Sequence, residues 1–70
     1  MEPLEQDAMI RKYDYLVRAC AARLGVHNDD DALQCGLIGL WEACRAWDGK
    51  RSFAPMARRC ITHNIIDCLR

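Results

Sequence analysis

Apolar residues recur along the first part of the chain at steps of three and four, which is the period of an α-helix. This stripe consists of Met9, Ile10, Tyr13, Leu16, Val17, Cys20, Ala21 and Leu24. Pro3 precedes it, and a first helical turn tolerates proline; Gly25 follows it, and glycine is typical of a helix end. The pattern therefore predicts a helix over about residues 4–24.

A second stretch with the same period opens after four residues that cap helices well: Asn28, Asp29, Asp30 and Asp31. Its apolar stripe consists of Leu33, Leu37, Leu40, Trp41, Cys44 and Trp47. Gly36 and Gly39 interrupt it, and each costs about 1 kcal/mol relative to alanine inside a helix. We predict a helix over about residues 30–47 whose glycines permit close approach of a neighbouring helix.

A third stretch follows Ser52, a good N-cap, and places Pro55 in a first turn, where its missing N–H does no harm. Its apolar stripe consists of Phe53, Ala57, Cys60, Ile61, Ile65, Cys68 and Leu69. This predicts a helix over about residues 53–69. Because no stretch alternates as a strand would, we predict an all-α fold, a compact three-helix bundle in which residues 1–70 form one domain.

Charge is unevenly distributed in a chain whose formal net charge is zero. Residues 1–49 hold nine acidic and five basic side chains, whereas residues 50–70 hold five basic side chains and a single acid, Asp67. The split suggests two faces for different partners, one of them a nucleic acid, although a solvated mixed surface explains such short blocks equally well. No apolar run reaches the roughly 18–20 residues of a membrane span. The acidic start is unlike a signal peptide, so we expect a cytoplasmic protein with no membrane partner.

The five cysteines are odd in number and show no Cys-x-x-Cys spacing. Four of them occupy stripe positions that suit a small apolar residue: Cys20, Cys44, Cys60 and Cys68. We interpret these as core thiols in a reducing cytosol. Cys35 lies off the stripe, where it could be exposed, but no basic residue adjoins it in sequence to lower its pKa. His27 and His63 stand beside no cysteine pair, so no metal site is predicted.

No arrangement typical of catalysis or cofactor binding is visible in the sequence. It contains no Gly-rich phosphate loop, no Gly-x-Ser-x-Gly and no His-Glu-x-x-His. The run 29–31 lacks the spaced oxygens of a calcium loop, and we interpret it as a helix cap. We predict a protein that is not an enzyme and that uses no cofactor.

The segment 31–70 carries a family resemblance. It reads Asp31-Ala-Leu-Gln34-Cys-Gly36-Leu-Ile-Gly39-Leu40-Trp-Glu-Ala43, then Trp47-Asp48, then Ser52-Phe53-Ala-Pro-Met-Ala57-Arg58, then Ile61 and Ile65-Ile66-Asp67. This resembles region 2 of bacterial RNA polymerase sigma factors, whose pattern is Asp-Leu-(Ile/Val)-Gln-Glu-Gly-x-Ile-Gly-Leu-x-x-Ala, Phe-Asp, Phe-x-x-Tyr-Ala and an Ile-Arg-x-x-Ile helix. The Gln-x-Gly-x-Ile-Gly-Leu core is its most specific part. The first helix also looks like the helix that precedes this motif, so the resemblance covers nearly the whole chain.

The resemblance implies two partners. The helix over residues 30–47 would dock on the clamp coiled coil in the largest subunit of the bacterial RNA polymerase core. The positions that match this contact are Asp31, Gln34, Cys35, Leu37 and Trp41. The third helix would face the promoter −10 element, where family aromatic residues help to open the duplex. We take as DNA-binding candidates Arg51, Phe53, Arg58, Arg59, Thr62 and His63.

The sequence departs from the family pattern at several functional positions. A Glu, a Tyr and two Trp of the family are replaced by Cys35, Met56, Arg59 and Cys60. Phe53 is the only aromatic residue after Trp47, so little of the stacking platform remains and unaided promoter melting is not expected. The sequence holds nothing like the helix-turn-helix that reads the −35 element. It would be either an excised domain or a minimal factor that works with a second DNA-binding protein supplying −35 recognition.

Three functions agree with these patterns. The first, which we favour, is a sigma-like transcription initiation factor. The second is a polymerase-binding regulator or anti-sigma decoy without promoter melting, and the third is an unrelated helical DNA-binding module. Trp47 is expected in the core, whereas Trp41 fits the core or an exposed anchor equally well. A solvent-facing patch of Asp31, Gln34 and Trp41 would favour a protein-docking surface.

Overall fold

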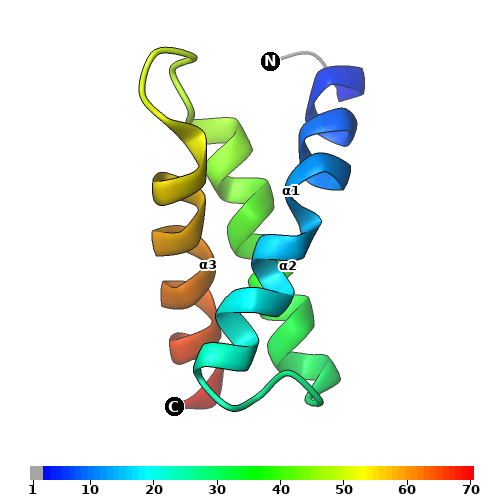
Figure 1. Cartoon of the computed structure of the whole chain (residues 1–70), viewed down its shortest axis with the longest axis vertical. Helices are drawn as coiled ribbons and strands as arrows, with labels where there is room; N and C mark the ends of the chain where they lie inside the picture. The colour runs from blue at the N-terminus through cyan, green and yellow to red at the C-terminus, as the bar shows by residue number, and fades with distance from the viewer. Residues whose placement is uncertain (1–2) are drawn as a thin grey trace.

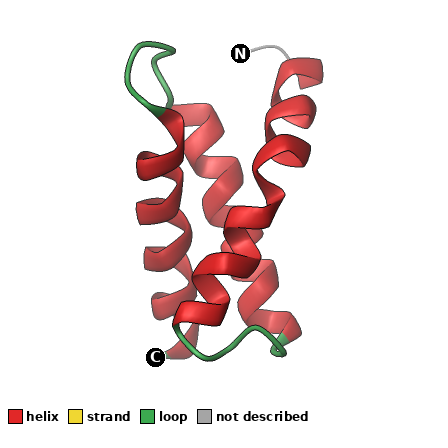
Figure 2. Cartoon of the chain, in the orientation of Figure 1, coloured by secondary structure: helices red, strands yellow, loops and turns green. Residues whose placement is uncertain are grey.

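Three helices make up most of the computed structural model, which describes residues 3–70 (Figures 1 and 2). Helix α1 spans Pro3–Arg23, α2 spans Asp30–Ala46 and α3 spans Phe53–Leu69. Within the described residues there is no strand. The all-α prediction is confirmed, and each predicted helix boundary lies within one residue of the observed one.

The helices form a bundle in which α1 and α3 run in the same direction and α2 runs in the opposite direction (Figure 1). The loop between α1 and α2 lies at the same end as the C-terminus, and the loop between α2 and α3 lies at the other end. Each helix packs against both of the others, and the described chain measures 31 × 20 × 17 Å along its principal axes.

The core is built from small and medium-sized side chains of all three helices. Its buried members are Leu16, Val17, Cys20, Ala21, Ala32, Leu40, Ala43, Cys44, Phe53, Ala57, Ile61 and Ile65. Among the described residues, no polar or charged side chain is buried with them. A core with so many alanine and cysteine side chains brings the helix backbones close together.

The closest approach of the helices occurs where α2 presents its two glycines. A Cβ atom on Gly39 would lie 2.7 Å from the carbonyl oxygen of Cys60 and 2.8 Å from Cα of Ile61, both in α3. A Cβ atom on Gly36 would lie 2.9 Å from Cγ1 of Val17 in α1. The predicted role of these glycines in close helix packing is confirmed.

Helix α1 ends in a glycine turn that closes its last carbonyl groups. Gly25 has φ of 75°, and its N–H donates to the carbonyl oxygen of Ala22 at 3.0 Å. The N–H of Val26 donates to the carbonyl oxygen of Ala21 at 2.9 Å. This is the Schellman pairing, in which glycine adopts the left-handed conformation without steric cost. The predicted stop at Gly25 is confirmed.

The two later helices begin differently. Oδ1 of Asp29 accepts hydrogen bonds from the N–H groups of Asp31 at 2.9 Å and Ala32 at 3.2 Å, so Asp29 is the N-cap of α2. Ser52 occupies the N-cap position of α3, but its side chain makes no capping hydrogen bond. The prediction of an acidic cap for α2 is confirmed, and Ser52 stands at the predicted N-cap position of α3, although without a side-chain hydrogen bond.

The loop between α2 and α3 is held by its own hydrogen bonds. Oδ1 of Asp48 accepts from the N–H groups of Lys50 at 2.9 Å and Arg51 at 3.2 Å, and Gly49 supplies a φ of 80°. These backbone N–H groups stabilise the carboxylate and lower the pKa of Asp48. Nε1 of Trp47 donates to the carbonyl oxygen of Arg51 at 2.7 Å. The loop therefore fixes where α3 starts relative to α2.

Candidate functional site

One side of α2 faces away from the core and carries a continuous row of exposed side chains. We call it the α2 face, and it consists of Asp31, Gln34, Leu37, Ile38 and Trp41. Their spacing of three and four residues puts them on one side of the helix. Leu37, Ile38 and Trp41 are 38%, 50% and 44% exposed. Trp41 is thus an exposed side chain on the same face as Asp31 and Gln34, which is the arrangement expected of a docking surface.

The apolar part of the α2 face is hollowed. Ile10 of α1 joins Leu37, Ile38 and Trp41 around a hollow of about 260 Å³ that only these four residues line. The guanidinium carbon of Arg45 lies 5.0 Å from the ring centroid of Trp41, within cation–π range. Ile10 and Ile38 were not among the predicted site residues. The sequence signal that could have identified Ile38 is its position as a large apolar residue outside the apolar stripe of the second predicted helix.

A charged groove continues the α2 face toward the start of α2. It has a volume of about 350 Å³ and lies between α1 and α2, lined by Asp14, Val17, Arg18, Asp30, Leu33, Gln34 and Leu37. Leu37 belongs to both hollows, so the charged groove and the apolar hollow adjoin. The surface therefore offers an apolar centre with charged side chains at one end.

Cys35 differs from the other predicted docking residues. A disulfide joins it to Cys68 in the last turn of α3, with a Cα–Cα distance of 6.4 Å. The prediction that Cys68 is a core thiol is wrong, because Cys68 lies on the exposed edge of α3, where the antiparallel course of α2 brings Cys35 beside it. Cys35 is half-buried under this link rather than freely exposed.

The other cysteines are free thiols. Cys20 and Cys44 are buried in the core, as predicted, and burial raises the pKa of the Cys44 thiol because the thiolate loses its hydration. Cys60 is half-buried and packs against the core. A protonated, buried thiol is a poor nucleophile, so Cys44 serves packing rather than chemistry.

Four of the predicted DNA-binding residues share one side of α3. We call this the basic face, and it consists of Arg58, Arg59, Thr62 and His63. Thr62 is half-buried and the other three are exposed. Nε2 of His63 lies 3.2 Å from Oδ2 of Asp67, one turn further along. Arg51 stands apart in the α2–α3 loop, where its Nε lies 3.6 Å from Oδ2 of Asp48.

Phe53 lies in the core and does not belong to this exposed set. It is 4% exposed, with ring centroids of Tyr13 at 4.7 Å and Trp47 at 5.4 Å. A base cannot stack on a ring that two other aromatic side chains cover, so we withdraw Phe53 from the DNA-binding candidates. Trp47 is half-buried against the same cluster, in agreement with its predicted place in the core.

The described residues offer no group of three or more His, Cys, Asp or Glu side chains that could hold a metal ion. The acidic run at 29–31 starts α2, and Asp29 is engaged as its cap. In the same part of the chain, no helix is both long and apolar enough to cross a membrane. The surface presents an apolar hollow on α2 and guanidinium groups on α3.

Comparison with known proteins gives one match. The family model described as sigma-70 region 2 matches residues 9–70, which includes all of α2 and α3 and most of α1. No curated protein and no solved structure matches the chain.

Proposed function

This chain belongs to the sigma-70 region 2 family, and we propose that it docks on the RNA polymerase core through its α2 face while α3 lies near promoter −10 DNA. The family is one of transcription initiation factor domains without enzymatic activity. In the proposed complex the α2 face meets the clamp coiled coil of the largest polymerase subunit, and the basic face meets the phosphate backbone.

The observation that carries the docking part is the exposed indole of Trp41 in an apolar hollow. A monomer gains nothing from leaving a tryptophan 44% exposed beside two exposed aliphatic side chains. Aromatic side chains are enriched among the residues that dominate binding energy, where polar neighbours exclude water around them. Asp31 and Gln34 provide such neighbours at one end of the α2 face. The hollow suits an apolar side chain from the partner helix pair.

Binding of the full chain to purified core polymerase tests this proposal. Trp41→Ala is expected to weaken binding by about 30-fold, the effect of losing roughly 2 kcal/mol at an interface hot spot. Asp31→Ala combined with Gln34→Ala is expected to weaken it as well. Tyr15→Ala is the matched control, because Tyr15 is an aromatic side chain 57% exposed on α1, outside the α2 face.

The three variants should keep the helical content of the wild type, since each altered side chain is exposed. A housekeeping sigma factor should displace the wild-type chain if both use the same site on the clamp. Equal affinities of Trp41→Ala and Tyr15→Ala would show that the α2 face does not dock on polymerase.

The burial of Phe53 favours a second candidate function, a polymerase-binding regulator that does not melt promoters. With Phe53 covered by Tyr13 and Trp47, the basic face presents guanidinium groups and the imidazole of His63, but no Phe, Tyr or Trp ring, to an unpaired base. Fluorescence of 2-aminopurine in the −10 element separates the two candidates, because it rises when the base unstacks. A rise with core polymerase and this chain supports initiation, and a constant signal with intact docking supports the regulator. Family membership excludes the unrelated DNA-binding module.

A further inference from the structure

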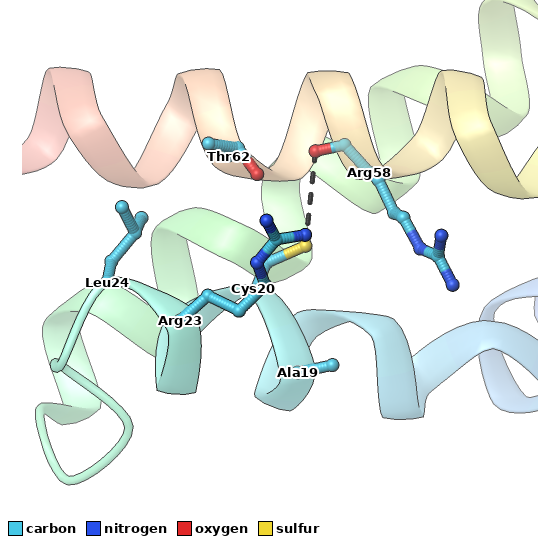
Figure 3. A pocket seen from close by; sticks show the side chains of 6 residues that line it. All are labelled: Ala19, Cys20, Arg23, Leu24, Arg58 and Thr62. Carbon is cyan, nitrogen blue, oxygen red and sulfur yellow. Dashed lines mark hydrogen bonds between the residues drawn. The ribbon is translucent and has the colours of Figure 1, made fainter.

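A groove between α1 and α3 lies outside the α2 face (Figure 3). It has a volume of about 490 Å³ and is lined by Ala19, Cys20, Arg23, Leu24, Arg58 and Thr62. The helices stay close at its floor, where Sγ of Cys20 lies 4.0 Å from the carbonyl oxygen of Arg58. Two of its residues, Arg58 and Thr62, belong to the basic face, and the other four come from α1 and the residue after it.

The two arginines reach across this groove from opposite sides. Arg23 extends from the last turn of α1 toward α3, and Arg58 extends from α3 toward α1 (Figure 3). Of the described residues that line the groove, none is acidic. Among the side chains that the structure describes, the contacts between basic and acidic groups join Arg51 to Asp48 and His63 to Asp67, so neither Arg23 nor Arg58 has an acidic partner. Two guanidinium groups without an acidic partner leave this groove with unbalanced positive charge, which attracts an anion.

The remaining residues of the groove suit a phosphate group. Guanidinium groups bind phosphate oxygens through parallel N–H donors, and a threonine hydroxyl adds a further donor at the edge of the groove. The hydroxyl of Thr62 points from α3 toward α1, and Thr62 and Arg23 line the same groove (Figure 3). Ala19 and Leu24 supply apolar walls, which reduce competition from water for these hydrogen bonds.

We propose that Arg23, Arg58 and Thr62 together hold one phosphodiester group of a nucleic acid backbone in the α1–α3 groove. The source is a nucleic acid rather than a small free anion because the groove opens onto the basic face. Arg59 and His63 there offer donors to neighbouring phosphates of the same strand. The inference rests on the DNA-binding part of the proposed function and adds α1, through Arg23, to the nucleic acid surface.

The salt dependence of binding to a labelled −10 oligonucleotide tests the inference. Each phosphate contact contributes about 0.9 to the slope of log affinity against log salt on duplex DNA and about 0.7 on single strands. Arg23→Gln is expected to weaken DNA binding and to reduce the slope by the contribution of about one phosphate contact. The control is Arg11→Gln, an exposed arginine of α1 that lines none of the three grooves described above, and it should leave the slope nearly unchanged.

A double variant shows whether the two arginines share one phosphate. If they do, Arg23→Gln combined with Arg58→Gln reduces the slope no further than the larger single effect. Additive reductions would assign the arginines to separate phosphates and overturn the shared site. Arg23→Lys keeps the charge but not the forked donor, so it should retain most of the slope and lose part of the affinity.

Three further outcomes separate this inference from the rest of the proposed function. If wild-type chain binds DNA and Arg23→Gln behaves like Arg11→Gln, the groove is not part of the DNA surface although the proposed function stands. If inorganic phosphate shifts the Arg23 Nε–H resonance while DNA affinity ignores Arg23→Gln, the groove holds a small anion and the nucleic acid source is wrong. If the wild-type chain binds polymerase but does not bind DNA at all, the inference is wrong and the proposed docking surface still stands.

Discussion

Gly36 and Gly39 lie in the same helix, yet they face different kinds of atoms. At Gly39 the nearest atoms are backbone atoms of Cys60 and Ile61, which move only if all of α3 moves. At Gly36 the nearest atoms belong to the side chains of Val17 and Ile65. Side chains can rotate away from an added methyl group, whereas the backbone of α3 cannot. Replacing Gly36 by alanine should therefore cost less stability than replacing Gly39.

Overpacking typically costs about 1–3 kcal/mol and alanine returns roughly 1 kcal/mol of helix propensity, so Gly39→Ala should lower the free energy of unfolding by up to about 2 kcal/mol. Gly36→Ala should cost clearly less, because the same propensity gain offsets a milder clash. Urea unfolding followed by circular dichroism measures both. A larger loss at Gly36 than at Gly39 would show that the backbone contact does not limit the distance between α2 and α3.

At the scale of the helices, the hydrophobic stripes were sufficient to locate α1, α2 and α3. Each stripe is long enough for the helical period to be unambiguous, and Gly25 and Asp29 are residue types whose backbone roles are local. Ser52 shows the limit of such local rules. Its residue type suits a cap, but the actual side-chain hydrogen bond depends on how the 47–52 loop enters α3.

The two caps give a matched experiment on these local rules. Asp29→Ala removes both hydrogen bonds at the start of α2 and should destabilise the fold by about 1 kcal/mol. Ser52→Ala removes no side-chain hydrogen bond and should cost less than half of that. Thermal or urea unfolding of the two variants provides the comparison, and equal losses would contradict the difference in capping.

The features that the sequence did not predict depend on how helices face one another. Cys35 and Cys68 are 33 residues apart, and only the register of α2 against α3 places them together. From the sequence, Phe53 could belong either to the apolar stripe that faces the core or to a surface on which DNA bases stack. Its burial beneath Tyr13 places it in the core. Arg23 belongs to the acidic part of the chain, so charge segregation along the sequence could not predict that it lines a groove together with Arg58 of α3.

For the whole molecule, the two proposed surfaces use different grooves of one bundle. The α2 face and its adjoining hollows involve α1 and α2, whereas the basic face and its groove involve α1 and α3. Helix α1 contributes Ile10 to the first and Arg23 to the second. In the proposed function, polymerase and DNA would therefore bind at the same time without competing for a side chain.

The disulfide between Cys35 and Cys68 should contribute to the stability of the whole chain. Closing a segment with a sequence separation of 33 reduces the entropy of the unfolded state and stabilises the fold by about 3–4 kcal/mol. Cys35→Ser and Cys68→Ser should each lose this stability under oxidising conditions and resemble the wild type under reducing ones. Cys60→Ser is the control, since Cys60 is a free thiol. Urea unfolding with and without reductant measures the effect, and a wild type insensitive to reductant would contradict it.

The same link changes what a break in the backbone would do. The loop between α2 and α3 exposes Lys50 and Arg51, the residue types after which trypsin cuts, at the end of the bundle opposite Cys68. Because the disulfide between Cys35 and Cys68 already links α2 to α3, cleavage of the loop leaves the two fragments covalently joined. After such cleavage α3 stays covalently attached to α2 until a reductant breaks the disulfide.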